Sequence, residues 1–235
     1  MKFILRLFFR LLYHQFAFTY DLVAAAVSFN RWKDWVISVI PFIEGNRILE
    51  IGHGPGHLQR ILLTLRHSSG QARNLVAVGI DESAQMGHLA KRNLTRRSSS
   101  QSSQPASIPY SSPLAYTQIN LARGIGQHLP FRNESFDTVV ATFPTEYITD
   151  PGTLAEVKRC LSNEGRFIVL PVAWPKNRFL DWLFKITSQS PTEAMEVVKS
   201  RLREPFVHAG FKTEIQTVDV QSSTLLIVLA TKPSR

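Results

Sequence analysis

Residues 47–62 read RILEIGHGPGHLQRIL, a short apolar run that leads into glycines at 52, 54 and 56 and then into an amphipathic stretch. Glycine suits such a reversal because it adopts backbone angles that other residues avoid and lets a ligand approach the main chain closely. The pattern therefore predicts a strand, a ligand-binding turn and a helix. His57 stands where the dinucleotide-binding pattern G-x-G-x-x-G has its last glycine, which argues against a nicotinamide cofactor.

Two acidic residues accompany this turn. Glu50 precedes Gly52 by two residues, and Asp81 ends the next apolar run, in the stretch AVGIDES. In open α/β folds, ligands bind at the carboxyl ends of the strands, which is where both carboxylates are expected. A carboxylate at the end of the second strand can accept hydrogen bonds from both hydroxyls of a ribose. The alternative for Asp81 is capping of the helix that follows it.

The rest of the chain alternates short apolar runs with amphipathic stretches, as an α/β sheet does. Only residues 221–223 separate the last two runs, too few for a parallel crossover, so the final strand is expected to be antiparallel. The predicted fold is a mixed seven-stranded sheet with helices on both faces. The strands are expected at 47–51, 75–80, 116–123, 136–143, 166–172, 213–220 and 224–231, and the helices at 57–65, 83–93, 153–161, 178–186 and 192–208.

Residues 1–43 are expected to form a helical cap in front of a domain that spans residues 44–235. Within the cap, Lys2, Arg6, Arg10 and His14 recur every four residues among apolar side chains, so they line one stripe of a helix. Residues 1–18 either lie in a membrane interface or dock over a cleft of the same protein. Ser, Gln and Pro dominate residues 98–113, which are expected to form a mobile surface loop.

Composition narrows the setting of the protein. Lys and Arg number 27 against 18 Asp and Glu, a formal charge of +9 that favours anionic partners without choosing among them. The single cysteine, Cys160, cannot form an internal disulfide and falls in the apolar register of its helix. Because no group of Cys and His has metal-site spacing either, we expect no metal. A cytoplasmic location fits these features best, with or without peripheral membrane contact.

Four segments together resemble one family, the class I S-adenosylmethionine (SAM) dependent methyltransferases. EIGHGPG resembles the glycine-rich motif of that family, GID its ribose-binding acid, LPFRNESFDTVVATF the entry into its fourth strand, and LAEVKRCLSNEGRFIVL its helix, turn and fifth strand. The resemblance extends from about Tyr20 to Lys232. It implies a Rossmann-like sheet whose seventh strand is antiparallel, with SAM as the cofactor.

The resemblance also implies roles for single residues. Glu50 would hold the methionine amino group, Asp81 would bind the ribose, and His53 lies within the turn whose backbone contacts the cofactor. Ile125 stands where related chains have an acid that contacts adenine, so this chain departs from the pattern. The other implied contacts come from the backbone of the turn, from the adenine loop and from a tyrosine that closes over the cofactor: Gly52, Gly54, Gly56, Gly126, Gln127 and Tyr20.

The acceptor is less well defined by the sequence. Glu146 and Tyr147 follow the fourth strand, at the edge that faces the transferable methyl group, and are the candidate catalytic residues on the acceptor side. An aromatic segment at 174–184 and the apolar N-terminus favour a small, lipophilic acceptor. Two alternatives stay open. The first is a nucleic-acid methyltransferase, disfavoured because FPTEY lacks the Asn/Asp-Pro-Pro-aromatic run, and the second is a non-catalytic protein that binds a membrane or a partner.

Overall fold

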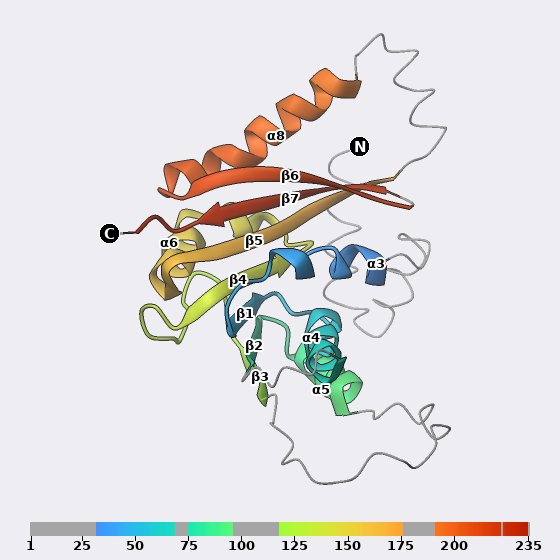
Figure 1. Ribbon diagram of the computed structural model, residues 1–235. Helices are drawn as coiled ribbons and strands as arrows, with labels where there is room; N and C mark the ends of the chain where they lie inside the picture. Colours follow the sequence, from blue (N-terminus) through green and yellow to red (C-terminus); the bar gives the residue numbers. More distant parts are fainter. Residues whose placement is uncertain (1–31, 69–74, 96–117, 176–190, 222, 235) are drawn as a thin grey trace.

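The computed structural model describes residues 32–68, 75–95, 118–175, 191–221 and 223–234 of the chain. Within these ranges the chain forms one seven-stranded sheet in the order β3-β2-β1-β4-β5-β7-β6 (Figure 1). Tyr20, the membrane-contact segment 1–18, the serine-rich loop 98–113 and the helix expected at 178–186 lie outside the described residues. The strands are β1 (Arg47–Ile51), β2 (Val76–Asp81), β3 (Gln118–Arg123), β4 (Phe136–Thr142), β5 (Leu161–Pro175), β6 (Lys212–Val220) and β7 (Ser223–Thr231).

The strand directions confirm the predicted α/β fold. Strands β1 to β5 pair in parallel, whereas β7 is antiparallel to both β5 and β6. Strand order reverses between β1 and β4, because β2 and β3 lie on one side of β1 while β4 and β5 lie on the other. The carboxyl edge beside such a reversal is the usual ligand site of an open α/β sheet. The glycine turn after β1 and the loop after β4 meet there.

Helices cover both faces of the sheet. On one face, Trp35 of α3 and Leu58 of α4 pack with Ile48 and Val140 of the central strands. On the other face, Val157 and Phe206, from α6 and α8, pack with Phe167 of β5. The helices are α3 (Trp32–Ile37), α4 (His57–Ser68), α5 (Ala84–Thr95), α6 (Pro151–Cys160) and α8 (Pro191–His208), with short 3-10 helices η2 (Ile40–Phe42) and η3 (Glu146–Thr149).

The alternation of apolar residues explains why the central strands are buried on both faces. Along β1, Leu49 and Ile51 point into the core beside α6, whereas Ile48 points into the core beside α3 and α4. Parallel strands covered by helices on both faces read as continuous apolar runs rather than as an alternating pattern. Cys160 is fully buried in the same core, as its position in the apolar register predicts.

One predicted helix, 153–161, was wrong at both ends. Helix α6 begins at Pro151, because Asp150 caps it by accepting a hydrogen bond from the backbone N–H of Thr153. Proline is well suited to the first helical position, since its missing N–H has no partner there. The helix ends at Cys160, and Leu161 is extended and pairs with Phe136 of β4. Strand β5 therefore begins before the Asn-Glu-Gly turn that the sequence suggests as its boundary.

Candidate functional site

The turn after β1 has the backbone that its glycines predict. Gly52, Gly54 and Gly56 have φ angles of 74°, 51° and 82°, in the left-handed region that favours glycine. The N–H of Gly52 donates to the carbonyl oxygen of Ile80 at 2.7 Å, and the N–H of Gly56 closes the turn on the carbonyl oxygen of His53 at 2.9 Å. These bonds tie the turn to the end of β2 and lead the chain directly into α4.

The three glycines are needed for different contacts. A Cβ on Gly56 would lie 3.1 Å from Cβ of Ala90, so this glycine lets α4 approach α5. A Cβ on Gly54 would meet nothing within 4 Å, which leaves that part of the turn open on the ligand side. A Cβ on Gly52 would overlap the hydroxyl of Tyr147. The turn is therefore packed behind at Gly56, open at Gly54 and covered at Gly52.

Asp81 fastens the turn from the neighbouring strand. Its Oδ2 accepts a hydrogen bond from the N–H of Gly54, and its Oδ1 accepts one from the N–H of Ser83, both at 2.8 Å. Helix α5 is capped by Ser83 itself, whose hydroxyl accepts from the N–H of Met86 at 3.3 Å. Each carboxylate oxygen can accept more than one hydrogen bond, so Asp81 retains capacity for a diol.

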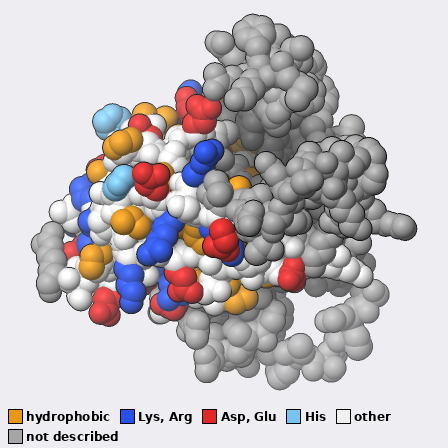
Figure 2. Space-filling view, turned by 90° about the horizontal axis from the view of Figure 1, so that it is seen from above, with side chains coloured by type: hydrophobic (Ala, Val, Ile, Leu, Met, Phe, Trp, Pro, Cys, Tyr) orange, Lys and Arg blue, Asp and Glu red, His pale blue; other side chains and the backbone are white. Residues whose placement is uncertain are grey.

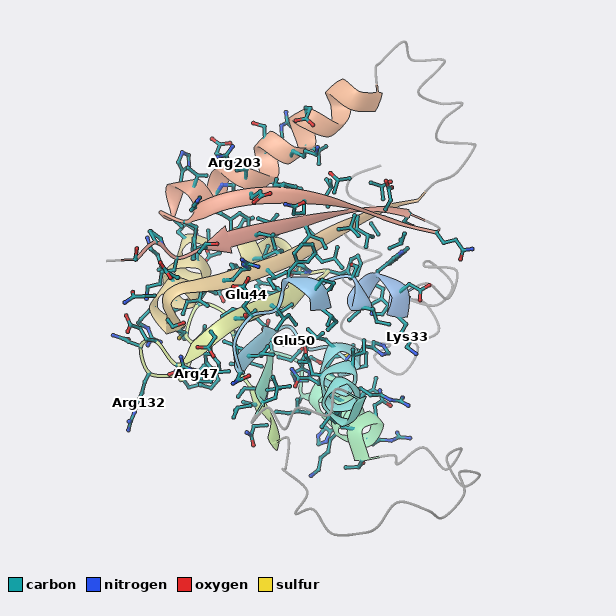
Figure 3. All side chains as sticks on the ribbon, viewed as in Figure 1. Lys33, Glu44, Arg47, Glu50, Arg132 and Arg203 are labelled. Carbon is teal, nitrogen blue, oxygen red and sulfur yellow. The ribbon has the colours of Figure 1, made fainter. Side chains whose placement is uncertain are left out.

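Glu50 lies inside the protein, at the end of β1 next to α4 (Figure 3). Gln59 of α4 donates from Nε2 to Oε2 of Glu50 at 2.8 Å. Burial raises the pKa of the Glu50 carboxyl to about 8; the hydrogen bond from Gln59 opposes this rise, and the negative charge of Asp81 adds to it. At neutral pH the acid is therefore largely uncharged, and a cation placed beside it would favour its ionised form.

His53 is buried within the turn. Its Nδ1 donates to the carbonyl oxygen of Gly54 at 2.7 Å, because a carbonyl can only accept, and its buried Nε2 has no hydrogen-bond partner. Gly79 of β2 makes room for the ring, since a Cβ there would lie 3.1 Å from Cδ2 of His53. The imidazole thus stabilises the turn through its bond to Gly54, and its Nε2 remains a buried acceptor without a donor.

The loop after β3 forms a second wall of the site. The N–H of Gly124 donates to the carbonyl oxygen of Asp81 at 3.0 Å, which places residues 124–128 beside the turn. Gly126 is buried against Thr153 and Tyr147; a Cβ there would lie 3.1 Å from Oγ1 of Thr153 and 3.5 Å from Cδ2 of Tyr147. Ile125 is 39% exposed, so an apolar side chain faces solvent in this loop.

Gln127 lies next to α6, because a Cβ on Gly152 would be 3.6 Å from Cγ of Gln127. The hydroxyl of Thr153 at the start of α6 is buried and without a hydrogen-bond partner. Sequence reasoning did not mark Thr153, nor Gln59, whose Oε1 is likewise buried and unpartnered. Neither residue lies in a motif, so only their contacts with Gly126 and Glu50 could reveal them.

The two candidate catalytic residues both follow β4 but lie in different surroundings. Tyr147 is half-buried and its hydroxyl donates to the carbonyl oxygen of Ile51 at 3.3 Å, whereas Glu146 is exposed. Phe143 has a φ of 50°, and its N–H donates to the carbonyl oxygen of Leu170 at 2.7 Å. The structure thus brings Tyr147 onto the glycine turn and leaves Glu146 at the rim.

An aromatic cluster adjoins this loop. The ring centroid of Phe143 lies 4.3 Å from that of Trp32 and 5.7 Å from that of Trp35. Nε1 of Trp35 is buried without a hydrogen-bond partner. The sequence showed Trp32 and Trp35 only as apolar positions of a helix; their place beside the exit of β4 follows from the packing of α3. The cluster belongs to the apolar core beside α3 and α4, at the exit of β4.

The described residues that the sequence assigned to the cofactor, Glu50, the three glycines, His53, Asp81, Gly126 and Gln127, lie around one edge of the sheet. Their chemistry fits SAM: a backbone free of side chains at Gly54, an acid with acceptor capacity at Asp81, and a buried acid at Glu50 for a cationic group. In the part of the chain that the structure describes, no three His, Cys, Asp or Glu side chains gather as metal ligands.

The site lies within a region that matches a known protein family. Residues 49–169 match the family described as "Methyltransferase domain". This range runs from β1 to the middle of β5, so it includes the glycine turn, Asp81, the loop after β3 and the loop after β4. It covers more than half of the chain.

Two curated relatives match much of the chain. A demethylmenaquinone methyltransferase of Symbiobacterium thermophilum is 28% identical over 179 residues, which is 74% of this chain and 63% of the relative. A ubiquinone/menaquinone biosynthesis C-methyltransferase of Geotalea uraniireducens is 26% identical over 161 residues, 67% of this chain and 60% of the relative. The chain thus spans less than two thirds of the length of these relatives.

Solved structures confirm the fold. A SAM-dependent methyltransferase of Thermotoga maritima superposes with a TM-score of 0.55 at 18% identity, covering 93% of this chain and 98% of the other. A second, from Methanosarcina mazei, gives a TM-score of 0.51 at 16% identity over 84% of this chain and 98% of the other. At these identities the likeness concerns the fold alone.

Proposed function

Because the chain belongs to the methyltransferase domain family, we propose that it transfers a methyl group from SAM to a small, lipophilic acceptor of the quinone type. The observation that carries the proposal is the glycine turn fastened by Asp81 at the carboxyl edge of β1 and β2. A turn that is open at Gly54 and bordered by a carboxylate suits a nucleoside ligand.

Each residue of the site has a distinct task in this proposal. Asp81 accepts hydrogen bonds from the ribose hydroxyls while it keeps its bonds to the N–H groups of Gly54 and Ser83. Glu50, held by Gln59, faces the cationic methionine end. Gly126 and Gln127 border the adenine, where Ile125 supplies an apolar contact in place of an acid. His53 supports the turn, and Tyr20 is the proposed cover.

The cofactor supplies a methyl group that is electrophilic because it is bound to a sulfonium. The protein must therefore align the acceptor and keep water away from the site. A ring carbon that received this methyl group would then have to lose its proton. Glu146, exposed at the rim, is the proposed acceptor of that proton, and Tyr147 borders the path to it.

The relatives favour a quinone-type acceptor, since both act on quinone precursors by name. The cluster of Phe143, Trp32 and Trp35 supports the same class, because planar rings stack favourably on aromatic side chains. The proposed acceptor is therefore a flat, oxygen-bearing ring with an apolar substituent.

A lipophilic acceptor has to be collected from a membrane. We propose a cytoplasmic protein that contacts the membrane peripherally through residues 1–18, where basic residues recur every four positions among apolar ones. Among the described residues, no helix is long and apolar enough to cross a membrane. Sedimentation with anionic vesicles, with and without residues 1–18, tests this contact; equal sedimentation of both chains would contradict it.

The proposed activity is tested by incubating the protein with radiolabelled SAM and a reduced naphthoquinone that lacks the ring methyl group. We expect label in the organic extract as the ring-methylated product. A phenol without the second ring, a catechol and an RNA oligonucleotide serve as competing acceptors. Label in the RNA alone would contradict the proposed acceptor, and no labelled product from any acceptor would contradict the enzyme.

A further inference from the structure

Tyr147 lies between the glycine turn and the loop after β3, where the proposed function requires the cofactor to bind. Its hydroxyl reaches the start of the glycine turn, where it donates to the carbonyl oxygen of Ile51 and would overlap a Cβ on Gly52. Its Cδ2 lies 3.5 Å from the Cβ position of Gly126, on the adenine loop. One phenol ring therefore spans the gap between the two backbone segments that a nucleoside cofactor has to approach.

A cofactor held at the glycine turn would need the surface that the Tyr147 hydroxyl covers. Gly52 lacks a side chain, which is what allows close approach to its backbone, and the Tyr147 hydroxyl already fills that space. At the other end of the ring, Gly126 is flanked by Tyr147 and by the buried, unpartnered hydroxyl of Thr153. A buried hydroxyl without a partner is unfavourable, so a ligand that replaced the ring of Tyr147 and bonded the Thr153 hydroxyl would relieve that cost.

We propose that Tyr147 occupies the cofactor site of the cofactor-free protein and has to swing out before SAM binds. Its backbone permits such a movement, because Tyr147 belongs to the four-residue 3-10 helix η3, whose N-cap Thr145 makes no side-chain capping bond. The loop before it contains Phe143 in the left-handed conformation, which costs energy for a bulky residue. The inference rests on the proposed function, since it presumes that a cofactor binds at the turn.

The proposal has a kinetic consequence. If the cofactor binds only the open form, the apparent affinity and association rate are reduced by the fraction of molecules that are open. Removing the hydroxyl removes the bond to Ile51, a neutral hydrogen bond that holds the closed form. The open fraction, and with it the association rate, should rise roughly 2- to 10-fold. The dissociation rate should not change, because the open, bound form lacks that bond.

The test is stopped-flow binding of S-adenosylhomocysteine, followed by the tryptophan fluorescence of the protein, for the wild type and Tyr147→Phe. The phenylalanine retains the ring that packs against Gly126, so the fold is expected to survive, and circular dichroism checks this. Thr145→Ala is the matched control, because it removes an exposed hydroxyl that makes no capping bond at the start of the same 3-10 helix. We expect faster association for Tyr147→Phe only, with a dissociation constant lower by the same factor.

Three other results would overturn the proposal. An unchanged association rate with normal binding would mean that Tyr147 does not obstruct the site. Weaker binding through faster dissociation would mean that the hydroxyl holds the bound cofactor instead. No binding to the wild type or to either variant, all folded, would overturn the proposed function and this inference with it, so the two failures are distinguishable.

Discussion

Glu50 is the residue whose ionisation the fold alters most at the site. Burial raises its pKa to about 8, with Asp81 adding to the rise and Gln59 opposing it. A cation bound beside the carboxyl favours its ionised form, so binding should release a proton below pH 8. We expect the affinity for SAM to increase between pH 6 and pH 8 in the wild type.

The matched variant for this prediction is Glu50→Gln, which keeps the shape of the side chain but cannot ionise. Its affinity for SAM should be lower at pH 8 and should not increase with pH in that range. Calorimetry in two buffers of different ionisation enthalpy measures the proton released. Equal proton release by the wild type and Glu50→Gln would show that another group supplies it.

The same pKa predicts a change in stability. Because the pKa of Glu50 is about 8 when folded and 4.5 ordinarily, the folded protein binds more protons than the unfolded chain between those values. Its contribution to stability is complete below about pH 4.5 and is lost as pH rises to 8, on the order of a few kcal/mol. Urea unfolding at pH 6, 7, 8 and 9 should show the wild type losing stability relative to Glu50→Gln, with no further loss above pH 8 or so. A constant difference would contradict the assignment.

At the scale of elements, the glycine turn and α5 give a matched pair of variants. Gly54→Ala places a Cβ in open space, so it costs only the left-handed conformation, roughly 1 kcal/mol. Gly56→Ala has the same conformational cost, and its Cβ also comes too close to Ala90 of α5. Together these should reduce the free energy of unfolding by roughly 2–4 kcal/mol. Thermal and urea unfolding measure both. Equal losses would mean that α4 and α5 do not depend on the glycine for their approach.

The elements were predictable where a local pattern decides them. Apolar runs and the residues that break them located the strands, and the three-residue connection at 221–223 set the direction of β7. The start of α6 was missed because the Asp150 cap, not apolar periodicity, decides it. The start of β5 was missed because pairing of Leu161 with Phe136 overrides the turn signal of Asn163 and Glu164.

The candidate site was predictable where its residues lie in sequence motifs, and not where they depend on tertiary contacts. The turn and Asp81 lie in consecutive motifs, so their meeting at one edge follows from parallel pairing of β1 and β2. The position of Tyr147 depends on η3 and on the left-handed Phe143, neither of which has a local sequence signal. Trp35 likewise reaches Phe143 only through the packing of α3. These contacts are tertiary and could not be read from the chain.

Among the described residues, positive and negative charges are mixed on the face that carries α8, where Lys and Arg side chains alternate with Asp and Glu (Figure 2). Several described cations are paired, among them Arg159 with Glu156, Arg166 with Glu44 and Lys199 with Glu196. The described part of this face therefore shows no single-sign stripe of the kind by which proteins hold a phosphate backbone.

We therefore expect weak binding to nucleic acid. Fluorescence anisotropy with a labelled single-stranded RNA should show an affinity no better than non-specific, and little binding at physiological salt. A protein of the same net charge and known RNA affinity serves as the positive control. Tight binding that weakens steeply as salt increases would favour the nucleic-acid methyltransferase instead.

The central claim is that the glycine turn and Asp81 hold SAM. Calorimetric titration with S-adenosylhomocysteine tests it most directly, in the wild type, in Asp81→Asn and in Glu82→Gln. The asparagine retains the size of Asp81 but loses its charge, and Glu82 is an exposed neighbour. We predict binding to the wild type and Glu82→Gln, and at least tenfold weaker binding to Asp81→Asn. A folded wild type that does not bind, or equal binding by all three, would contradict the account.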